Sequence, residues 1–144
     1  MVTISFYIFS LFLSYIDYKS FRIPNIIIAT MAFFLIVFGI FEEKIELFSF
    51  VMPILVLLFF IALLLINKNA SVGGGDIKYY MVIALYLNPF LFAIFLIVTG
   101  LMQTLALIFR QFFQKRRVVA MGPVIFASVI ITEFLNYLGV IPKF

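Results

Sequence analysis

Long runs of apolar residues, separated by short polar interruptions, divide the chain into about six segments. Their approximate ranges are 2–16, 26–41, 47–66, 77–88, 90–110 and 119–138. A helix needs about 20 mostly apolar residues to cross a bilayer, and backbone groups in the hydrocarbon must pair within their own segment. The strict alternation that a transmembrane barrel requires is absent. The pattern predicts an all-α membrane protein with about six transmembrane helices, in a single domain over residues 1–144.

The junction Asn88-Pro89 admits two interpretations, a tight turn between two helices or a kink within one longer helix. Short loops rich in Lys and Arg tend to stay in the cytoplasm. The loops around the first, third and fifth interruptions hold eight of the ten basic residues: Lys19, Arg22, Lys68, Lys78, Arg110, Lys115, Arg116 and Arg117. A kink at Pro89 would move the last four to the other side. The charges therefore favour six segments, with both termini outside the cytoplasm.

The composition of the chain limits the residue types that could carry out catalysis. The sequence is 67% hydrophobic and 11% charged, whereas soluble domains are about 25% charged. It contains no cysteine and no histidine. Disulfides, thiolate nucleophiles, zinc sites built on Cys or His, and histidine bases are thereby excluded. We expect no metal and no cofactor, so any catalysis must rely on the six acidic residues.

Four of the six acidic residues have an ordinary structural explanation. Glu42, Glu43 and Glu46 lie in one outer loop beside Lys44, where we expect a solvated, ion-paired surface. Glu133 lies toward the outer end of the last segment, where it would snorkel or pair with a neighbouring helix. This leaves Asp17 and Asp76 as candidates for chemistry.

The predicted topology brings Asp17, at the end of the first segment, and Asp76, at the start of the fourth, to the same cytoplasmic face. Paired carboxyl groups can hydrolyse a peptide bond, because one takes a proton from water while the other donates a hydrogen bond to the scissile carbonyl. The alternative is that both are ordinary residues at the membrane surface. Gly73, Gly74 and Gly75 precede Asp76 and would form a turn or a hinge, although they also suit a plain linker.

Asp17 followed by Ile23-Pro24-Asn25, together with Gly73-x-Gly75-Asp76 and Lys78 behind it, resembles the type IV prepilin and preflagellin peptidases. The stretch Met121-Gly122-Pro123 is similar to that family's Gly-Pro element. The resemblance implies an aspartyl membrane endopeptidase that cuts the basic leader from membrane-inserted prepilin-like substrates at the cytoplasmic face. It makes Asp17 and Asp76 the catalytic pair, and it treats the remaining positions as motif-supporting residues: Ile23, Pro24, Asn25, Gly73, Gly75, Lys78, Gly122 and Pro123.

The chain lacks the cysteine-bearing insert of the larger bacterial members, so the resemblance implies a compact, peptidase-only form without N-methyltransferase activity. Two alternatives stay open, a small transporter or channel and a non-catalytic pilus-assembly subunit. Transporters place ionisable groups near the membrane midplane. Here the segment centres hold only mildly polar residues, such as Thr30, Thr99, Gln103 and Thr104.

Three further expectations concern electrostatics and motion. Helix dipoles favour Asp76 as the ionised base and Asp17 as the donor of a shared proton. The glycines would let Asp76 move, so that the two carboxyl groups need not touch without substrate. The basic cluster is expected to set topology and to contact anionic lipid headgroups; its members are Arg110, Lys115, Arg116 and Arg117.

Overall fold

The protein is a bundle of helices. The computed structural model describes residues 1–45, 47–66, 73–114 and 120–140, and in these ranges it contains helices and no strand. The elements are α1 (Val2–Ser20), α2 (Asn25–Phe41), η1 (Leu47–Phe50, a 3-10 helix), α3 (Val51–Ile66), α4 (Gly74–Tyr86), α5 (Pro89–Gln114) and α6 (Met121–Tyr137). The predicted all-α fold with six helical segments is thereby confirmed for the part of the chain described.

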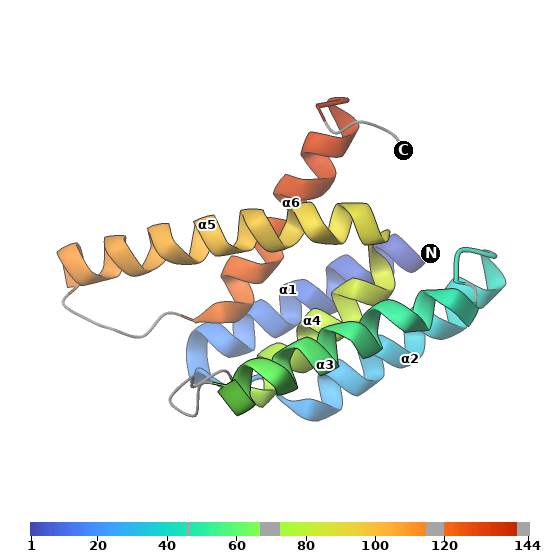
Figure 1. Cartoon of the computed structure of the whole chain (residues 1–144), viewed down its shortest axis with the longest axis horizontal. Coiled ribbons are helices and arrows are strands. Elements are labelled where there is room, and N and C mark those ends of the chain that lie inside the picture. The colour runs from blue at the N-terminus through green and yellow to red at the C-terminus, as the bar shows by residue number, and fades with distance from the viewer. Residues whose placement is uncertain (46, 67–72, 115–119, 141–144) are drawn as a thin grey trace.

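Successive helices run in opposite directions. In Figure 1, α1, α3 and α5 end toward the left of the bundle, whereas α2, α4 and α6 begin there. Helix α5 is long and apolar enough to cross a membrane over Pro89–Phe112, and α2, α3 and α6 are shorter apolar helices of 16 or 17 residues. The end of the bundle at which α1 ends and α4 begins is therefore shared by the segments that carry Asp17 and Asp76.

The helix boundaries resolve the choice at Asn88-Pro89. Helix α4 ends at Tyr86, Leu87 is extended (φ −90°, ψ 147°), and α5 starts at Pro89. Proline suits this first helical position because the missing N–H would have no partner inside the helix. The tight turn is confirmed, and the single kinked helix is wrong.

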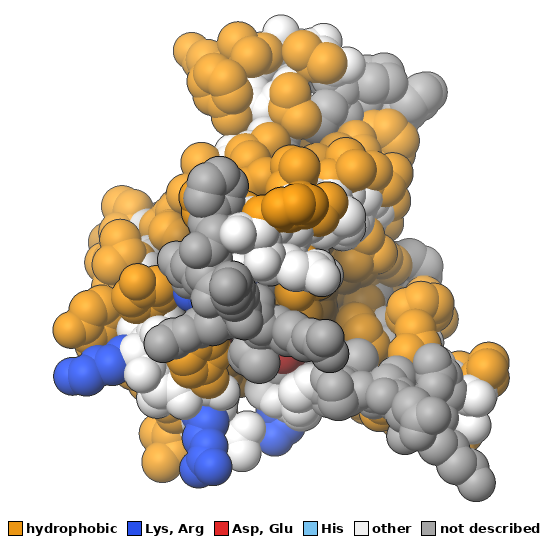
Figure 2. All heavy atoms as spheres, turned by 90° about the vertical axis from the view of Figure 1, so that its left-hand side faces the viewer, with side chains coloured by type: hydrophobic (Ala, Val, Ile, Leu, Met, Phe, Trp, Pro, Cys, Tyr) orange, Lys and Arg blue, Asp and Glu red, His pale blue; other side chains and the backbone are white. Residues whose placement is uncertain are grey.

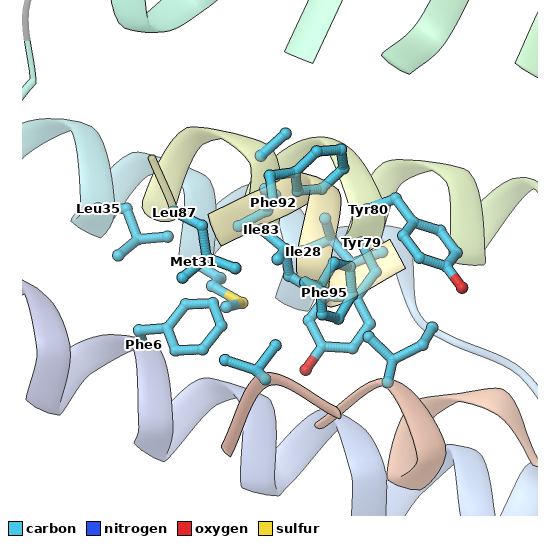
Figure 3. Packing of buried hydrophobic residues seen from close by; sticks show 14 of the residues in the cluster. Phe6, Ile28, Met31, Leu35, Tyr79, Tyr80, Ile83, Leu87, Phe92 and Phe95 are labelled. Carbon is cyan, nitrogen blue, oxygen red and sulfur yellow. The ribbon is translucent and has the colours of Figure 1, made fainter. Parts of the chain in front are cut away.

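Helix α4 is the centre of the packed core. Tyr79 and Ile83 are completely buried on it, and apolar side chains from α1, α2 and α5 close around them (Figure 3). Phe6 contributes from α1 and Phe95 from α5, both fully buried. Asp76 thus stands in the first turn of the helix that the rest of the bundle surrounds.

Candidate active site

A cavity of about 670 Å³ opens at the end of the bundle where α1 ends and α4 begins. Its lining includes seven of the predicted site residues: Asp17, Ile23, Asn25, Gly73, Gly75, Asp76 and Lys78. Helix α5 adds Gln103 and Leu107, and the start of α6 adds Met121. Figure 2 views this end and shows several Lys and Arg side chains on it, with an acidic side chain partly visible. Segments distant in sequence therefore meet at one cavity whose lining includes charged and polar side chains.

Asp17 lies inside α1, which continues beyond the apolar run to Ser20, and its side chain is buried, with 5% of the residue exposed. Its Oδ2 accepts a hydrogen bond of 2.7 Å from the backbone N–H of Gly122, at the start of α6. Ser14, one turn earlier, lies with its hydroxyl 3.2 Å from the carbonyl of the same glycine. Both backbone groups of Gly122 thus face α1 and hold Asp17 against the start of α6.

Gly122 belongs to the predicted Gly-Pro element, and its contact explains why a glycine is needed. A Cβ added there would lie 3.0 Å from Cβ and 3.2 Å from Oδ2 of Asp17. Pro123 sits in the first turn of α6, where proline is tolerated, and it does not line the cavity. The element therefore acts on the site through Gly122.

Asp76 lies in the first turn of α4, where its backbone N–H bonds to the carbonyl of Gly73 at 3.0 Å. Its carboxylate folds back over that glycine: a Cβ added at Gly73 would lie 2.7 Å from Asp76 Oδ2. Asp76 is near enough to Asp17 for the two charges to act on each other, yet no hydrogen bond joins these two described side chains. The two carboxyl groups thus line the same cavity without a hydrogen bond between them.

The glycines before Asp76 do not form the turn that we expected. Gly74 and Gly75 already belong to α4, and Gly73 is extended at the helix start (φ −63°, ψ 131°). Among the described residues, the glycine with positive φ is Gly139. The backbone instead makes a close approach at Gly75, where an added Cβ would lie 3.0 Å from Ile23 Cβ, whereas one at Gly74 meets nothing within 4 Å.

The Ile23-Pro24-Asn25 element packs directly on the start of α4. Pro24 precedes α2 in an extended conformation (φ −68°, ψ 126°), so the chain leaves α1 and enters α2 beside Gly75. Lys78 Nζ donates a 2.9 Å hydrogen bond to Asn25 Oδ1. The sequence did not indicate a role for Lys78. In the structure its bond joins the Ile23-Pro24-Asn25 element to α4, the helix that carries Asp76.

Sequence reasoning missed Gln103 and Tyr80. Gln103 was counted as a mildly polar residue in an apolar segment, but it lines the cavity, and its Nε2 donates to the Tyr80 hydroxyl at 3.1 Å. Tyr80 lies one turn after Asp76 on the same face of α4. An amide within the apolar helix α5 was the available signal, since such a group needs partners in an apolar environment.

The acidic loop residues and the basic cluster do not line the cavity where the structure describes them. Glu42 pairs with Lys44 at 2.8 Å, as expected for that loop, and Glu46 lies outside the described residues. Arg110 stands over the Phe21 ring at 5.9 Å. The rest of the basic cluster lies outside the described residues: Lys115, Arg116 and Arg117. Within the described ranges, no group of three or more His, Cys, Asp or Glu side chains could hold a metal ion.

These observations define a helical protein with two aspartates in one cavity, each held by a glycine contact. A profile of the type IV leader peptidase family matches residues 4–109, more than half of the chain. The chain therefore belongs to the type IV leader peptidase family, as its motifs indicated. The match includes both aspartates and ends before Gly122. Comparison with curated proteins and with solved structures gave no significant match.

Proposed function

We propose that the protein is a membrane aspartyl endopeptidase that removes the leader from type IV prepilin-like precursors at the cytoplasmic face. Family membership supports a leader-peptidase-like protease in general terms. The observation that carries the finer proposal is the cavity that Asp17 and Asp76 line together, with no hydrogen bond between their carboxyl groups. Two carboxyl groups that line one cavity of about 670 Å³ could both reach a substrate bound there.

In this mechanism, one carboxylate takes a proton from water, and the resulting hydroxide attacks the scissile carbonyl carbon. The other carboxyl group, protonated, donates a hydrogen bond to the carbonyl oxygen and then passes its proton toward the leaving amine. The N-termini of α4 and α6 both point at the pair, since Asp76 lies in the first turn of α4 and Asp17 accepts the Gly122 N–H. Assigning the shared proton to Asp17 stays a prediction, because both carboxylates receive such support.

The position of the pair supports action at a membrane surface. Asp17 and Asp76 lie at one end of the bundle, where a peptide emerging from the bilayer is accessible. The excess of Lys and Arg on that side supports a cytoplasmic orientation, with six crossings and both termini on the other side. The proposed substrate is therefore a precursor inserted in the membrane with a basic leader on the cytoplasmic side. We expect no N-methyltransferase activity and no cofactor, and we expect anionic lipids near the basic cluster.

The test is leader removal in cells that co-express the protein with a candidate prepilin. We expect a shortened product with the parent protein and none with Asp17→Asn or Asp76→Asn, each checked for accumulation in the membrane. Retained cleavage in both variants would overturn the aspartyl mechanism. The same cells separate the alternatives, because solute uptake without cleavage indicates a transporter, and neither activity indicates an assembly subunit.

A further inference from the structure

We propose that Gln103 is a substrate-binding residue that holds the main chain of the peptide beside the bond to be cut. This inference rests on the proposed function, because it names a further contact in the same cavity. Gln103 stands near the middle of α5 and lines the cavity together with Asp17 and Asp76. It approaches the cavity from α5, whereas the two aspartates belong to α1 and α4.

The hydrogen bonds of Gln103 leave part of its amide group available. The amide offers two N–H donors and an oxygen that can accept two hydrogen bonds. Nε2 donates to the Tyr80 hydroxyl at 3.1 Å and to the Met121 sulfur at 3.3 Å, and a thioether is a weak acceptor. In the described part of the chain, no donor bonds to Gln103 Oε1. One strong acceptor and one weakly used donor are therefore free for a ligand in the cavity.

Tyr80 fixes this amide next to Asp76. Its ring packs between Phe60 of α3 and Phe95 of α5, with centroids 5.5 and 5.8 Å away. In Figure 3 the Tyr80 hydroxyl points away from the Tyr79 hydroxyl and out of the buried cluster. Because Tyr80 is one turn along α4 from Asp76, the bond to Gln103 sets the amide at a defined place relative to the catalytic carboxylate.

A peptide main chain has the complementary chemistry. A membrane-inserted substrate must unwind near its scissile bond, which frees backbone N–H and C=O groups that are costly to leave unpaired in apolar surroundings. An amide side chain supplies one acceptor and one donor for such groups. It would do so whatever side chains the substrate carries.

The experiment compares Gln103→Leu with Tyr80→Phe in purified enzyme, measuring kcat and KM on a prepilin substrate. Tyr80→Phe removes the bond between the helices but leaves the Gln103 amide in the cavity. We expect Gln103→Leu to raise KM about tenfold and Tyr80→Phe to raise it less than about threefold, since one or two neutral hydrogen bonds are worth that much. Thr104→Val is the matched control, because Thr104 is the next residue and its hydroxyl bonds to Gly100 within α5. We expect that variant to match the parent.

Equal effects of Gln103→Leu and Tyr80→Phe, or an unchanged KM in Gln103→Leu, would overturn the inference and assign Gln103 to helix packing. If Gln103→Leu does not accumulate, Gln103→Met replaces it, because methionine has a similar length and no amide. A direct readout measures substrate binding to Asp17→Asn enzyme. The dissociation constant of the substrate should rise by the same factor when Gln103→Leu is added. Failure of the proposed function is distinguishable, since the parent enzyme would then release no leader at all.

Discussion

The helices α1, α4 and α6 meet at two carboxylate sites, and the two sites differ in how their carboxyl groups are hydrogen-bonded. At one end lie Asp17 and Asp76, in a cavity. At the other end lies Glu133, on α6, whose two oxygens accept hydrogen bonds from the hydroxyls of Tyr7 on α1 and Tyr86 on α4; the Tyr86 bond is 2.7 Å long. The sequence suggested only that Glu133 would snorkel or pair with a helix, and the pairing is confirmed.

The two sites lie at matching distances along the three helices. Ten residues separate Tyr7 from Asp17 and also Asp76 from Tyr86, and eleven separate Gly122 from Glu133. At 1.5 Å per residue, the sites are about 15 Å apart. Phe6 stacks on Tyr86 with centroids 4.0 Å apart and strengthens the contact between α1 and α4 at the Glu133 end. Side-chain contacts therefore join the three helices at the Glu133 end.

The difference shows how a small protein combines rigidity with reactive groups. A carboxylate with both oxygens bonded to phenols has little capacity left for a substrate. The aspartates, by contrast, contact the backbone of glycines, and their carboxylates keep hydrogen-bonding capacity for a ligand in the cavity. We infer that the Glu133 end holds the register of the helices, whereas the aspartate end is the part that the proposed function assigns to catalysis.

The largest expected effect tests this division directly. Asp17→Asn and Asp76→Asn should each lower kcat about 10²–10⁴-fold, the usual contribution of a general acid or base. Glu133→Gln, the same change at the other end, should retain activity within about tenfold. Leader cleavage by purified protein measures both. An equal loss in Glu133→Gln would remove the distinction between the two ends.

The next effect concerns the glycines that contact the aspartate end. Gly75→Ala and Gly122→Ala should each lower activity at least about tenfold, because their Cβ atoms would press on Ile23 and Asp17 and move groups that must be accurately aligned. Gly74→Ala is the control within the same motif. Its Cβ meets nothing, and alanine should raise the free energy of unfolding by about 0.4–1 kcal/mol, chiefly by reducing the entropy of the unfolded chain. Cleavage assays and thermal unfolding compare the three variants, and a loss in Gly74→Ala as large as in Gly75→Ala would contradict the close-approach argument.

At the Glu133 end we expect an effect on stability rather than on chemistry. Glu133→Leu should lower the free energy of unfolding by about 1–3 kcal/mol, because it removes two hydrogen bonds to a carboxylate from two helices. Tyr86→Phe should cost less, and adding it to Glu133→Leu should cost almost nothing more. Denaturant or thermal unfolding in detergent measures these values. Full additivity of the two changes would show that the hydrogen bond does not contribute.

The sequence predicted the members of the aspartate site better than their contacts. Asp17 and Asp76 stood out because charge is scarce in the chain, and loop charges indicated a common side. The bond from Gly122 to Asp17 joins residues 105 positions apart, and no local pattern encodes it. The tyrosine partners of Glu133 were hidden for the same reason.

Helix ends were predicted less well, because hydrophobicity and hydrogen bonding stop at different residues. The apolar run of the first segment ends near residue 16, but α1 continues through Asp17 to Ser20. Helix α4 begins at Gly74, three residues before its apolar run, although glycine is a poor helix former. Gly75 lies close against Ile23, a tertiary contact that local helix preference does not include.

The smallest expected effect tests the link between the two motifs at the aspartate end. Lys78→Met should lower cleavage about two- to threefold, because its 2.9 Å bond to Asn25 is exposed and worth about 0.5–1 kcal/mol. Asn25→Ala should have a similar effect, and the double variant should be no worse than either single variant, since both remove one contact. Kinetics of the four proteins in one membrane preparation complete this cycle. Strictly multiplicative losses would mean that Lys78 and Asn25 act separately, and that Lys78 serves the site through its charge instead of through the Asn25 bond.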